Sequence, residues 1–301
     1  MSNNSVCEVP NKGLYTSGYS IILLLGLTLN VYAFVILRKF QSPTSIYIKN
    51  LIFSDLLLIF TLPLRIYYYY NWSPRQQVTV PPWLCKAAGT ILLLNMYGSI
   101  FFLACISIDR CFAVCFPLST RHVRQKAIWV CVFIWALNLS SCLFTVVGVK
   151  LTEDWNNTCF HSHPPFVTLL GPTVGALALG FLVPLLIIAV SSCALLRAIS
   201  HSQSVQEGMV NKGKIVHMLL VNLSVFLICF LPYHIVILLY QFWNQSCKLS
   251  EAYKIALLMA CCNAMLDPIV YYFATETFRR KNAVENVRLA RDSDASTDRA
   301  K

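Results

Sequence analysis

The chain has 301 residues, of which 57% are hydrophobic and 12% are charged, with a formal net charge of +11. A soluble domain has roughly a quarter of its residues charged. This composition therefore argues against a soluble enzyme domain and favours a chain embedded in lipid. The length allows one membrane domain and little else.

Seven stretches are long and apolar enough to cross a bilayer, which takes about 20 predominantly apolar residues. In chain order they cover residues 13–37, 45–70, 87–108, 127–149, 166–196, 215–243 and 251–273. The second and the seventh each contain a carboxylate, and an ionisable group inside a span is costly enough to indicate a functional site. We expect an all-α membrane protein with a seven-transmembrane helix bundle.

The polar segments between these spans predict the orientation. Basic residues gather after the first, third, fifth and seventh spans, which places them all on one side of the membrane. They are Arg38, Lys39, Lys49, Arg121, Arg124, Lys126, Arg197, Lys212, Lys214, Arg279, Arg280 and Lys281. The positive-inside rule then places the N-terminus outside. Most of the net charge is explained in this way, so we expect no nucleic-acid partner.

Features of the outer segments agree with this orientation. Glycosylation sequons begin at Asn3, Asn156 and Asn244, all on the side predicted to be extracellular. Four cysteines lie at or near the same side, at Cys7, Cys85, Cys159 and Cys247. Because the outside is oxidising, this even set predicts two disulfides, for which the sequence permits three pairings.

Motif residues occur in order, one set in each span. They are Asn30, the stretch around Asp55, Asp109-Arg110-Cys111, Trp135, Pro184, Cys229 to Tyr233, and Asp267-Pro268-Ile269-Val270-Tyr271, followed by Phe278-Arg279-Arg280. Through these residues the chain resembles a rhodopsin-like (class A) G-protein-coupled receptor from Tyr15 to about Leu289. Leu62 to Tyr69, Asn95 to Ser99, Phe230 and Tyr271-Tyr272 are similar to the purinergic nucleotide and lysophosphatidic-acid receptor branch.

The resemblance implies an organisation and a set of partners. It implies an extracellular tail over 1–13, the seven-transmembrane domain over 14–273, an amphipathic eighth helix over 274–290 and a cytoplasmic tail over 291–301. It implies the disulfides Cys85–Cys159 and Cys7–Cys247. It also implies a multi-pass plasma-membrane protein that is no enzyme and that couples to a heterotrimeric G protein, with arrestin and receptor kinase as further partners.

Arg65 is the main candidate for ligand binding. A guanidinium facing the bundle would bind a phosphate or carboxylate headgroup bidentately, whereas the alternative is that it snorkels to the membrane interface. Related amine receptors bind their ligand with an aspartate where this chain has Leu92, so we expect an anionic amphiphile. A lysophospholipid fits best, with a nucleotide or a carboxylate as alternatives. The other candidate contacts are Tyr67, Lys86, Leu92, Met96, Tyr97, Tyr233, His234 and Lys254, although His234 is equally well explained as a packing residue.

A second candidate site lies in the middle of the bundle. Asp55, Ser99, Asn263 and Asp267 stand where the family binds sodium. Buried carboxylates must pair, bind a cation or take up a proton. We therefore expect a sodium ion or a shared proton, with a structural hydrogen-bond network as the alternative.

The resemblance also assigns the conformational switch. Pro232 and Pro268 weaken their helices because proline removes a backbone hydrogen bond. Phe226 and Phe230 are expected to repack, and Tyr271 to move inward. Asp109 is expected to hold Arg110 in the inactive state and release it to the G protein.

Rival functions fit less well. A retinal protein needs a lysine deep in the last span, and residues 255–273 contain none. An enzyme needs a coherent nucleophile and base, which we do not find. A non-signalling scavenger or a small transporter of the same shape remains as an alternative, but the intact Asp109-Arg110 pair and the lack of internal repeats favour a signalling receptor.

Overall fold

The computed structural model describes residues 11–73, 78, 80–116, 121–150, 159–160, 170–200, 212–243 and 246–269. Within these residues lie seven helical spans long and apolar enough to cross a membrane. The seven spans predicted from hydropathy are thereby confirmed. The predicted eighth helix over 274–290 lies outside the described residues.

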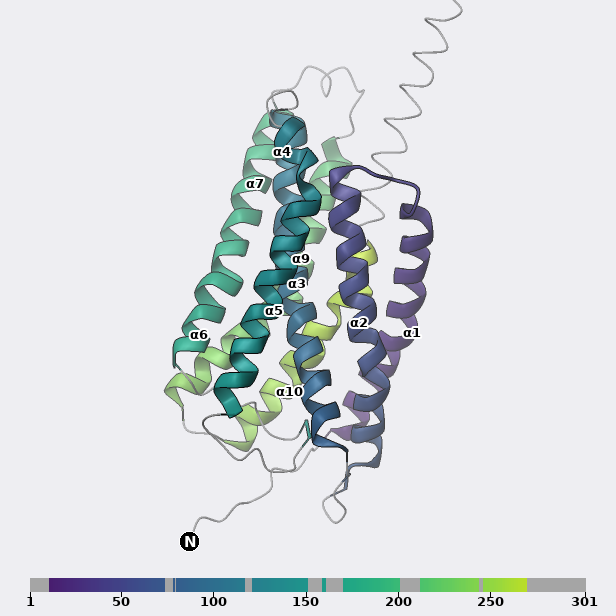
Figure 1. The fold of residues 1–301 in the computed structure, drawn as a ribbon, viewed down its shortest axis with the longest axis vertical. Coiled ribbons are helices and arrows are strands. Elements are labelled where there is room, and N and C mark those ends of the chain that lie inside the picture. The colour runs from purple at the N-terminus through teal and green to yellow at the C-terminus, as the bar shows by residue number, and fades with distance from the viewer. Residues whose placement is uncertain are drawn as a thin grey trace, which may run out of the picture.

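The described spans follow one another along the chain as long helices (Figure 1). The first four spans are α1 (Lys12–Leu37), α2 (Pro43–Asn71), α3 (Pro82–Cys115) and α5 (Ala127–Lys150), with the short α4 (Arg121–Gln125) before α5. The fifth span is built from α6 (Leu170–Leu177), the π-helical turn η2 (Ala178–Leu182) and α7 (Val183–Ser200). The last two begin with α9 (Lys212–Phe242) and α10 (Cys247–Cys261), and after a turn at Cys262 the seventh span continues to Ile269.

Local sequence signals set several helix starts. The Ser42 side chain accepts a hydrogen bond from the Ser45 amide at 3.2 Å, and Pro43 follows it as the first residue of α2. The Ser246 side chain accepts one from the Leu249 amide at 3.3 Å at the start of α10. Serine caps of this kind satisfy amide groups that the helix itself leaves unpaired.

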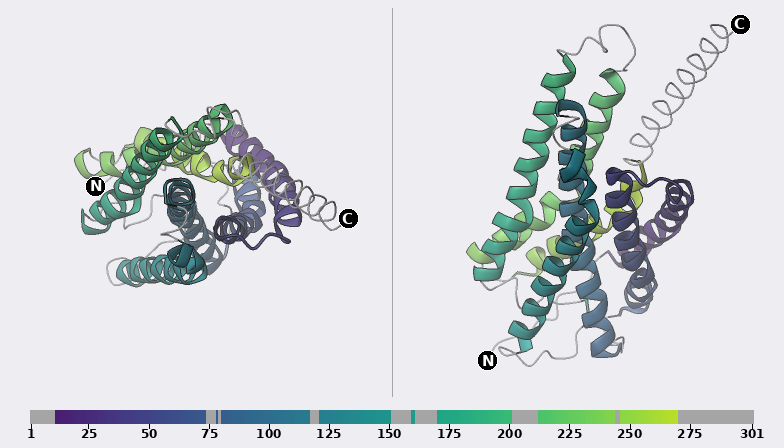
Figure 2. Two further views of the ribbon diagram at one scale, coloured as in Figure 1. Left: turned by 90° about the horizontal axis from the view of Figure 1, so that it is seen from above. Right: turned by 45° about the horizontal axis from the view of Figure 1, so that its top comes forward.

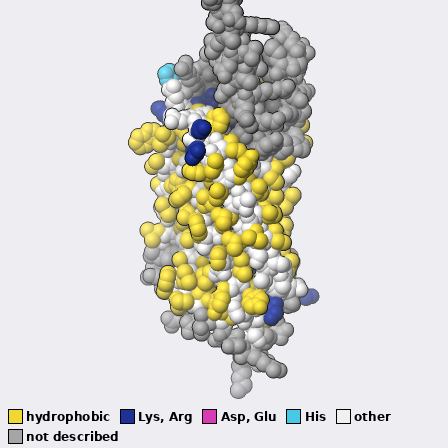
Figure 3. All heavy atoms as spheres, turned by 90° about the vertical axis from the view of Figure 1, so that its right-hand side faces the viewer, with side chains coloured by type: hydrophobic (Ala, Val, Ile, Leu, Met, Phe, Trp, Pro, Cys, Tyr) yellow, Lys and Arg dark blue, Asp and Glu magenta, His cyan; other side chains and the backbone are white. Residues whose placement is uncertain are grey.

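The helices pack around α3, which contacts α2, α5, α7, α9 and α10 (Figure 2). The apolar side chains are distributed unlike those of a soluble protein, because many of the largest point outward, including Phe60 and Phe144, each 75% exposed. On the face drawn in Figure 3, apolar side chains cover the middle, and lysine and arginine appear toward the ends. This surface suits a hydrocarbon environment.

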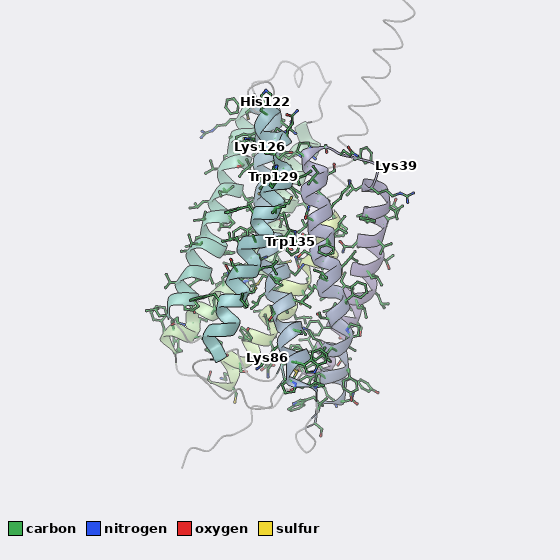
Figure 4. All side chains as sticks on the ribbon, in the orientation of Figure 1. Lys39, Lys86, His122, Lys126, Trp129 and Trp135 are labelled. Carbon is green, nitrogen blue, oxygen red and sulfur yellow. A yellow bond between two sulfur atoms is a disulfide. The ribbon has the colours of Figure 1, made fainter. Side chains whose placement is uncertain are left out.

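The two ends of the bundle are distinguished by their labelled side chains in Figure 4. Lys39, His122 and Lys126 lie at one end, and Lys86 lies at the opposite end. We call these the Lys126 end and the Lys86 end. Since α2 begins near Lys39 and finishes near the start of α3, Arg65 lies toward the Lys86 end and Asp55 lies between the ends.

Candidate functional site

Two cations are buried toward the Lys86 end. The Arg65 side chain on α2 and Lys254 on α10 belong to residues only 2% and 4% exposed, respectively. In the part of the chain that the structure describes, neither makes an ion pair with a carboxylate. A buried charge is unfavourable unless it is paired and hydrogen-bonded. Buried cations without a carboxylate partner make this end of the bundle attractive to anions.

Aromatic rings surround the Arg65 guanidinium. Its central carbon lies 4.4 Å from the ring centroid of Phe160 and 5.9 Å from that of Tyr19. Its Nη2 donates to the carbonyl oxygen of Ala88 at 3.4 Å, and its Nε is buried without a hydrogen-bond acceptor. Arg65 thus faces the bundle interior, as expected for a ligand-binding residue, and does not snorkel to the membrane interface.

Tyrosines join α1 to α2 beside this arginine. The Tyr69 ring stacks on Tyr15 and Tyr19, with centroids 4.7 and 5.9 Å apart. The hydroxyl groups of Tyr15 and Tyr19 are buried and have no hydrogen-bond partner in the described part of the chain. These three tyrosines were not predicted as site residues, although the four-residue spacing of Arg65 and Tyr69 on one helical face was a usable signal for Tyr69.

The predicted contact residue Tyr67 lies on the exposed side of α2. Tyr67 is 54% exposed and points away from the bundle, whereas Tyr68 and Tyr69 are buried. Two residues along an α-helix turn the side chain by roughly 200°. Tyr67 therefore faces the surroundings when Arg65 faces inward.

The other predicted contact residues lie inside the bundle. Leu92 and Met96 of α3, and Tyr233 and His234 of α9, are buried, whereas Lys86 and Tyr97 of α3 are partly buried. The structure brings three of them together: the His234 ring lies 5.9 Å from Tyr97 and 5.2 Å from Tyr233, between centroids. Tyr233 in turn lies 5.9 Å from Tyr253, the residue before Lys254.

His234 is chiefly a packing residue in this conformation. Its ring stacks on Phe181 at 4.3 Å between centroids, and its Nδ1 lies 2.8 Å from the carbonyl oxygen of Phe230. Because a carbonyl only accepts, we assign the proton of the neutral ring to Nδ1. Among the described residues its buried Nε2 has no partner, and in this tautomer Nε2 is an acceptor.

The mid-bundle cluster contains more residues than the sequence suggested. Asn95 donates to Asp55 Oδ1 at 2.9 Å and to Ser54 Oγ at 3.3 Å. Asn263 donates to Ser99 Oγ at 2.9 Å. Asp55 Oδ2, Asn263 Oδ1 and both carboxylate oxygens of Asp267 are buried and receive no hydrogen bond from the residues that the structure describes. Asn95 and Ser54 were not foreseen, because their contacts depend on how α2 and α3 pack.

The predicted switch residues form part of a continuous aromatic cluster. Phe226 and Phe230 meet edge to face, with centroids 5.6 Å apart. Phe181, which lies in the π-helical turn, stacks on Phe226 at 5.4 Å. Pro232 lies inside α9 and Pro268 inside the last span. Tyr271 lies outside the described residues.

At the Lys126 end, Asp109 has a partner that the sequence did not predict. The side chain of Arg124, on α4, donates to Asp109 Oδ1 at 2.7 Å from Nε and to Oδ2 at 3.4 Å from Nη2. The Thr44 hydroxyl, on α2, also donates to Asp109. The buried carboxylate of Asp109 therefore joins three helices and not merely its neighbour Arg110.

One of the two expected disulfides is described. Cys85, near the start of α3, is bonded to Cys159, and their Cα atoms are 5.6 Å apart. Cys247 is also disulfide-bonded, but its expected partner Cys7 lies outside the described residues, as do the sequon residues Asn3, Asn156 and Asn244.

Seven apolar spans that enclose buried, polar and charged clusters define a helical membrane protein. The family model described as "7 transmembrane receptor (rhodopsin family)" matches residues 28–271. The chain belongs to this family of receptors, and it is therefore a multi-pass membrane receptor and not an enzyme.

The sequence is similar to those of individual receptors over most of its length. Lysophosphatidic acid receptor 6 of Gallus gallus is 36% identical over 298 residues, which cover 92% of this chain and 94% of the relative. Lysophosphatidic acid receptor 4 of Mus musculus is 33% identical, with coverages of 92% and 79%. G-protein coupled receptor 183 of Rattus norvegicus is 30% identical, with coverages of 87% and 79%.

Proposed function

We propose that the protein is a plasma-membrane receptor that binds a lysophospholipid through its anionic headgroup and activates heterotrimeric G proteins. The observation that carries this proposal is the buried guanidinium of Arg65, which makes no ion pair among the described residues. An anionic headgroup would neutralise the guanidinium and accept hydrogen bonds from its N–H groups. Lys254 adds a second buried cation toward the same end.

The names of the relatives support this class of ligand. Two of the proteins compared above are lysophosphatidic acid receptors, and lysophosphatidic acid combines an acyl chain with a phosphate headgroup. The buried apolar residues Leu92 and Met96 suit the acyl chain. A lysophospholipid is therefore favoured over the nucleotide and the carboxylate.

We further propose that the Lys86 end faces the outside of the cell. The Cys85–Cys159 disulfide lies at this end, and disulfides form and persist in oxidising surroundings. Lys39 and Lys126 lie at the opposite end (Figure 4), as the positive-inside rule requires of the cytoplasmic side. Agonist and G protein would then bind at opposite ends of the same bundle.

The proposal is tested in cells that express the chain and a G-protein dissociation sensor. Oleoyl lysophosphatidic acid should activate the natural chain. Arg65→Ala should lower its potency by roughly 30-fold or more, because one partner of a desolvated charge pair is lost. Lys248→Ala serves as the control, since Lys248 is an exposed cation at the start of α10. Full potency in Arg65→Ala, at equal surface expression, would refute the assignment.

We also propose that the mid-bundle cluster binds a sodium ion. The oxygens of Asp55, Asp267 and Asn263 that lack donors are the hard ligands that such a cation prefers. A cation there would also reduce the repulsion between the two carboxylates. Asp55, Ser99, Asn263 and Asp267 would hold the ion and so stabilise one arrangement of α2, α3 and the last span.

A further inference from the structure

Phe160 has an unusual backbone conformation. Its φ is 51°, which makes it the one non-glycine residue with positive φ in the described part of the chain. A bulky side chain in the left-handed region is an outlier. Such strain persists only where the surroundings impose it, and it is concentrated at binding sites.

The surroundings of Phe160 are fixed on two sides. The preceding residue, Cys159, is tied by its disulfide to Cys85 near the start of α3. The Phe160 ring meets Tyr68 edge to face, with centroids 5.4 Å apart, and lies 4.4 Å from the guanidinium carbon of Arg65. Arg65 and Tyr68 are three residues apart on α2, so they present the same helical face.

The position of the Phe160 ring leaves N–H donors of Arg65 available for hydrogen bonds. A guanidinium has five N–H donors, and all of them point outward in its plane. The guanidinium carbon lies over the face of the Phe160 ring, so the ring attracts the charge without offering an oxygen or nitrogen acceptor to the N–H groups. Among the described residues, one edge contact is made, to the Ala88 carbonyl at a long 3.4 Å, and Nε has no acceptor. The remaining donors can therefore bind an anion.

We propose that Phe160 is the positioning residue of the anion site. Its ring holds the Arg65 guanidinium in place through a cation–π contact, so that the free N–H donors are preorganised for two oxygens of one phosphate. This inference rests on the proposed function, and it adds a loop residue that acts on the anion only through Arg65. The left-handed backbone is the conformation that brings the ring over Arg65 while Cys159 remains in its disulfide.

The experiment compares three substitutions at this position. Phe160→Leu keeps an apolar side chain but removes the aromatic face, and it should lower the potency of oleoyl lysophosphatidic acid by roughly 2- to 30-fold, the range of a cation–π contact. Phe160→Tyr retains the aromatic face, so its potency should stay within about threefold of that of the natural chain. Phe160→Gly relieves the backbone strain and removes the ring, so it should behave like Phe160→Leu if the ring matters. Tyr70→Leu changes an exposed aromatic residue on α2, the helix that carries Arg65, and should leave the potency unchanged.

A second readout keeps the test independent of the agonist. Inorganic phosphate should raise the thermal unfolding temperature of the purified, detergent-solubilised chain, less so in Phe160→Leu, and not in Arg65→Ala. Should Arg65→Ala abolish the response while Phe160→Leu retains full potency, the role of Phe160 is overturned and the proposed function stands. Equal losses in the Leu and Tyr variants would also overturn it. If neither the lipid nor phosphate acts on the natural chain, both proposals fall.

Discussion

Gly180 lies where the fifth span passes closest to the ring of Tyr97. A Cβ atom at Gly180 would lie 2.6 Å from Cε1 and 3.1 Å from Cδ1 of that ring. Gly180→Ala should therefore force Tyr97 to move, at a cost of about 1–3 kcal/mol, as for other overpacked positions. The measurement is the thermal unfolding temperature of the purified receptor, which should fall.

The matched control for this substitution is Gly175→Ala. Gly175 lies in α6 of the same span, and nothing lies within 4 Å of its Cβ position. Alanine there should stabilise the helix by about 0.5–1 kcal/mol, because glycine loses more backbone freedom on folding. If the two alanine variants unfolded at the same temperature, the contact between Gly180 and Tyr97 would have no energetic weight.

Individual residues show what the sequence can predict about the site. Arg65 and Lys254 were proposed from the sequence as cations in the outer parts of the second and seventh spans, and both are buried. Tyr67 is exposed, and the helical period relative to Arg65 would have predicted that difference. Phe160 was not predicted, since its contact with Arg65 depends on a disulfide, a left-handed backbone and the packing of a loop on α2.

At the scale of elements, an ion pair ties α4 to α3. A helix of five residues is too short to be stable alone, and Arg124 ties it to Asp109. Arg124→Gln and Asp109→Asn should each destabilise the receptor, by about 1.5–3 kcal/mol for hydrogen bonds to a charged group. The double variant should lose little more than either single variant. Thermal unfolding of all four proteins measures this coupling.

Lys126→Gln provides the control for this cycle. Lys126 is exposed at the same end of the bundle, so its effect should be small and should simply add to that of Asp109→Asn. Additive losses for Arg124→Gln and Asp109→Asn would mean that the pair contributes no interaction energy and that α4 is held in another way.

Hydropathy predicted the spans well but their ends less well. The third span was expected over 87–108, whereas α3 runs over Pro82–Cys115. Hydropathy marks the part of a helix that lies in lipid, and α3 continues past it through Asp109 and Arg110. The π-helical turn Ala178–Leu182 and the turn at Cys262 were not predicted either. Such shifts in backbone hydrogen bonding depend on packing between helices rather than on local sequence.

At the scale of the whole molecule, the polar cluster in the middle of the bundle links α2, α3 and the last span. Asp55 is on α2, Asp267 is on the last span, and α3 lies between them through Asn95 and Ser99. A ligand that prefers one arrangement of these helices shifts the population toward it. A sodium ion held by this cluster should therefore compete energetically with an agonist at the Lys86 end, although the two never touch.

Replacing potassium chloride with sodium chloride at constant ionic strength should thus weaken lysophosphatidic acid binding. Coupling between two sites is typically 1–3 kcal/mol, so we expect roughly a fivefold loss of affinity or more. The measurement is displacement of a labelled lysophospholipid from membranes. Asp55→Asn removes one of the two carboxylates. It should abolish the effect of sodium on affinity, while the variant still binds the lysophospholipid.

The same measurement separates sodium from a shared proton, the other way in which two buried carboxylates avoid repulsion. With a shared proton, affinity depends on pH and is the same in sodium and potassium chloride. With sodium, the difference between the salts persists at constant pH and disappears in Asp55→Asn. Equal affinities in the two salts would exclude the ion. In that case Asp55 and Asp267, whose oxygens lack donors among the described residues, would share a proton. The protonated pair would then stabilise the contact between α2 and the last span.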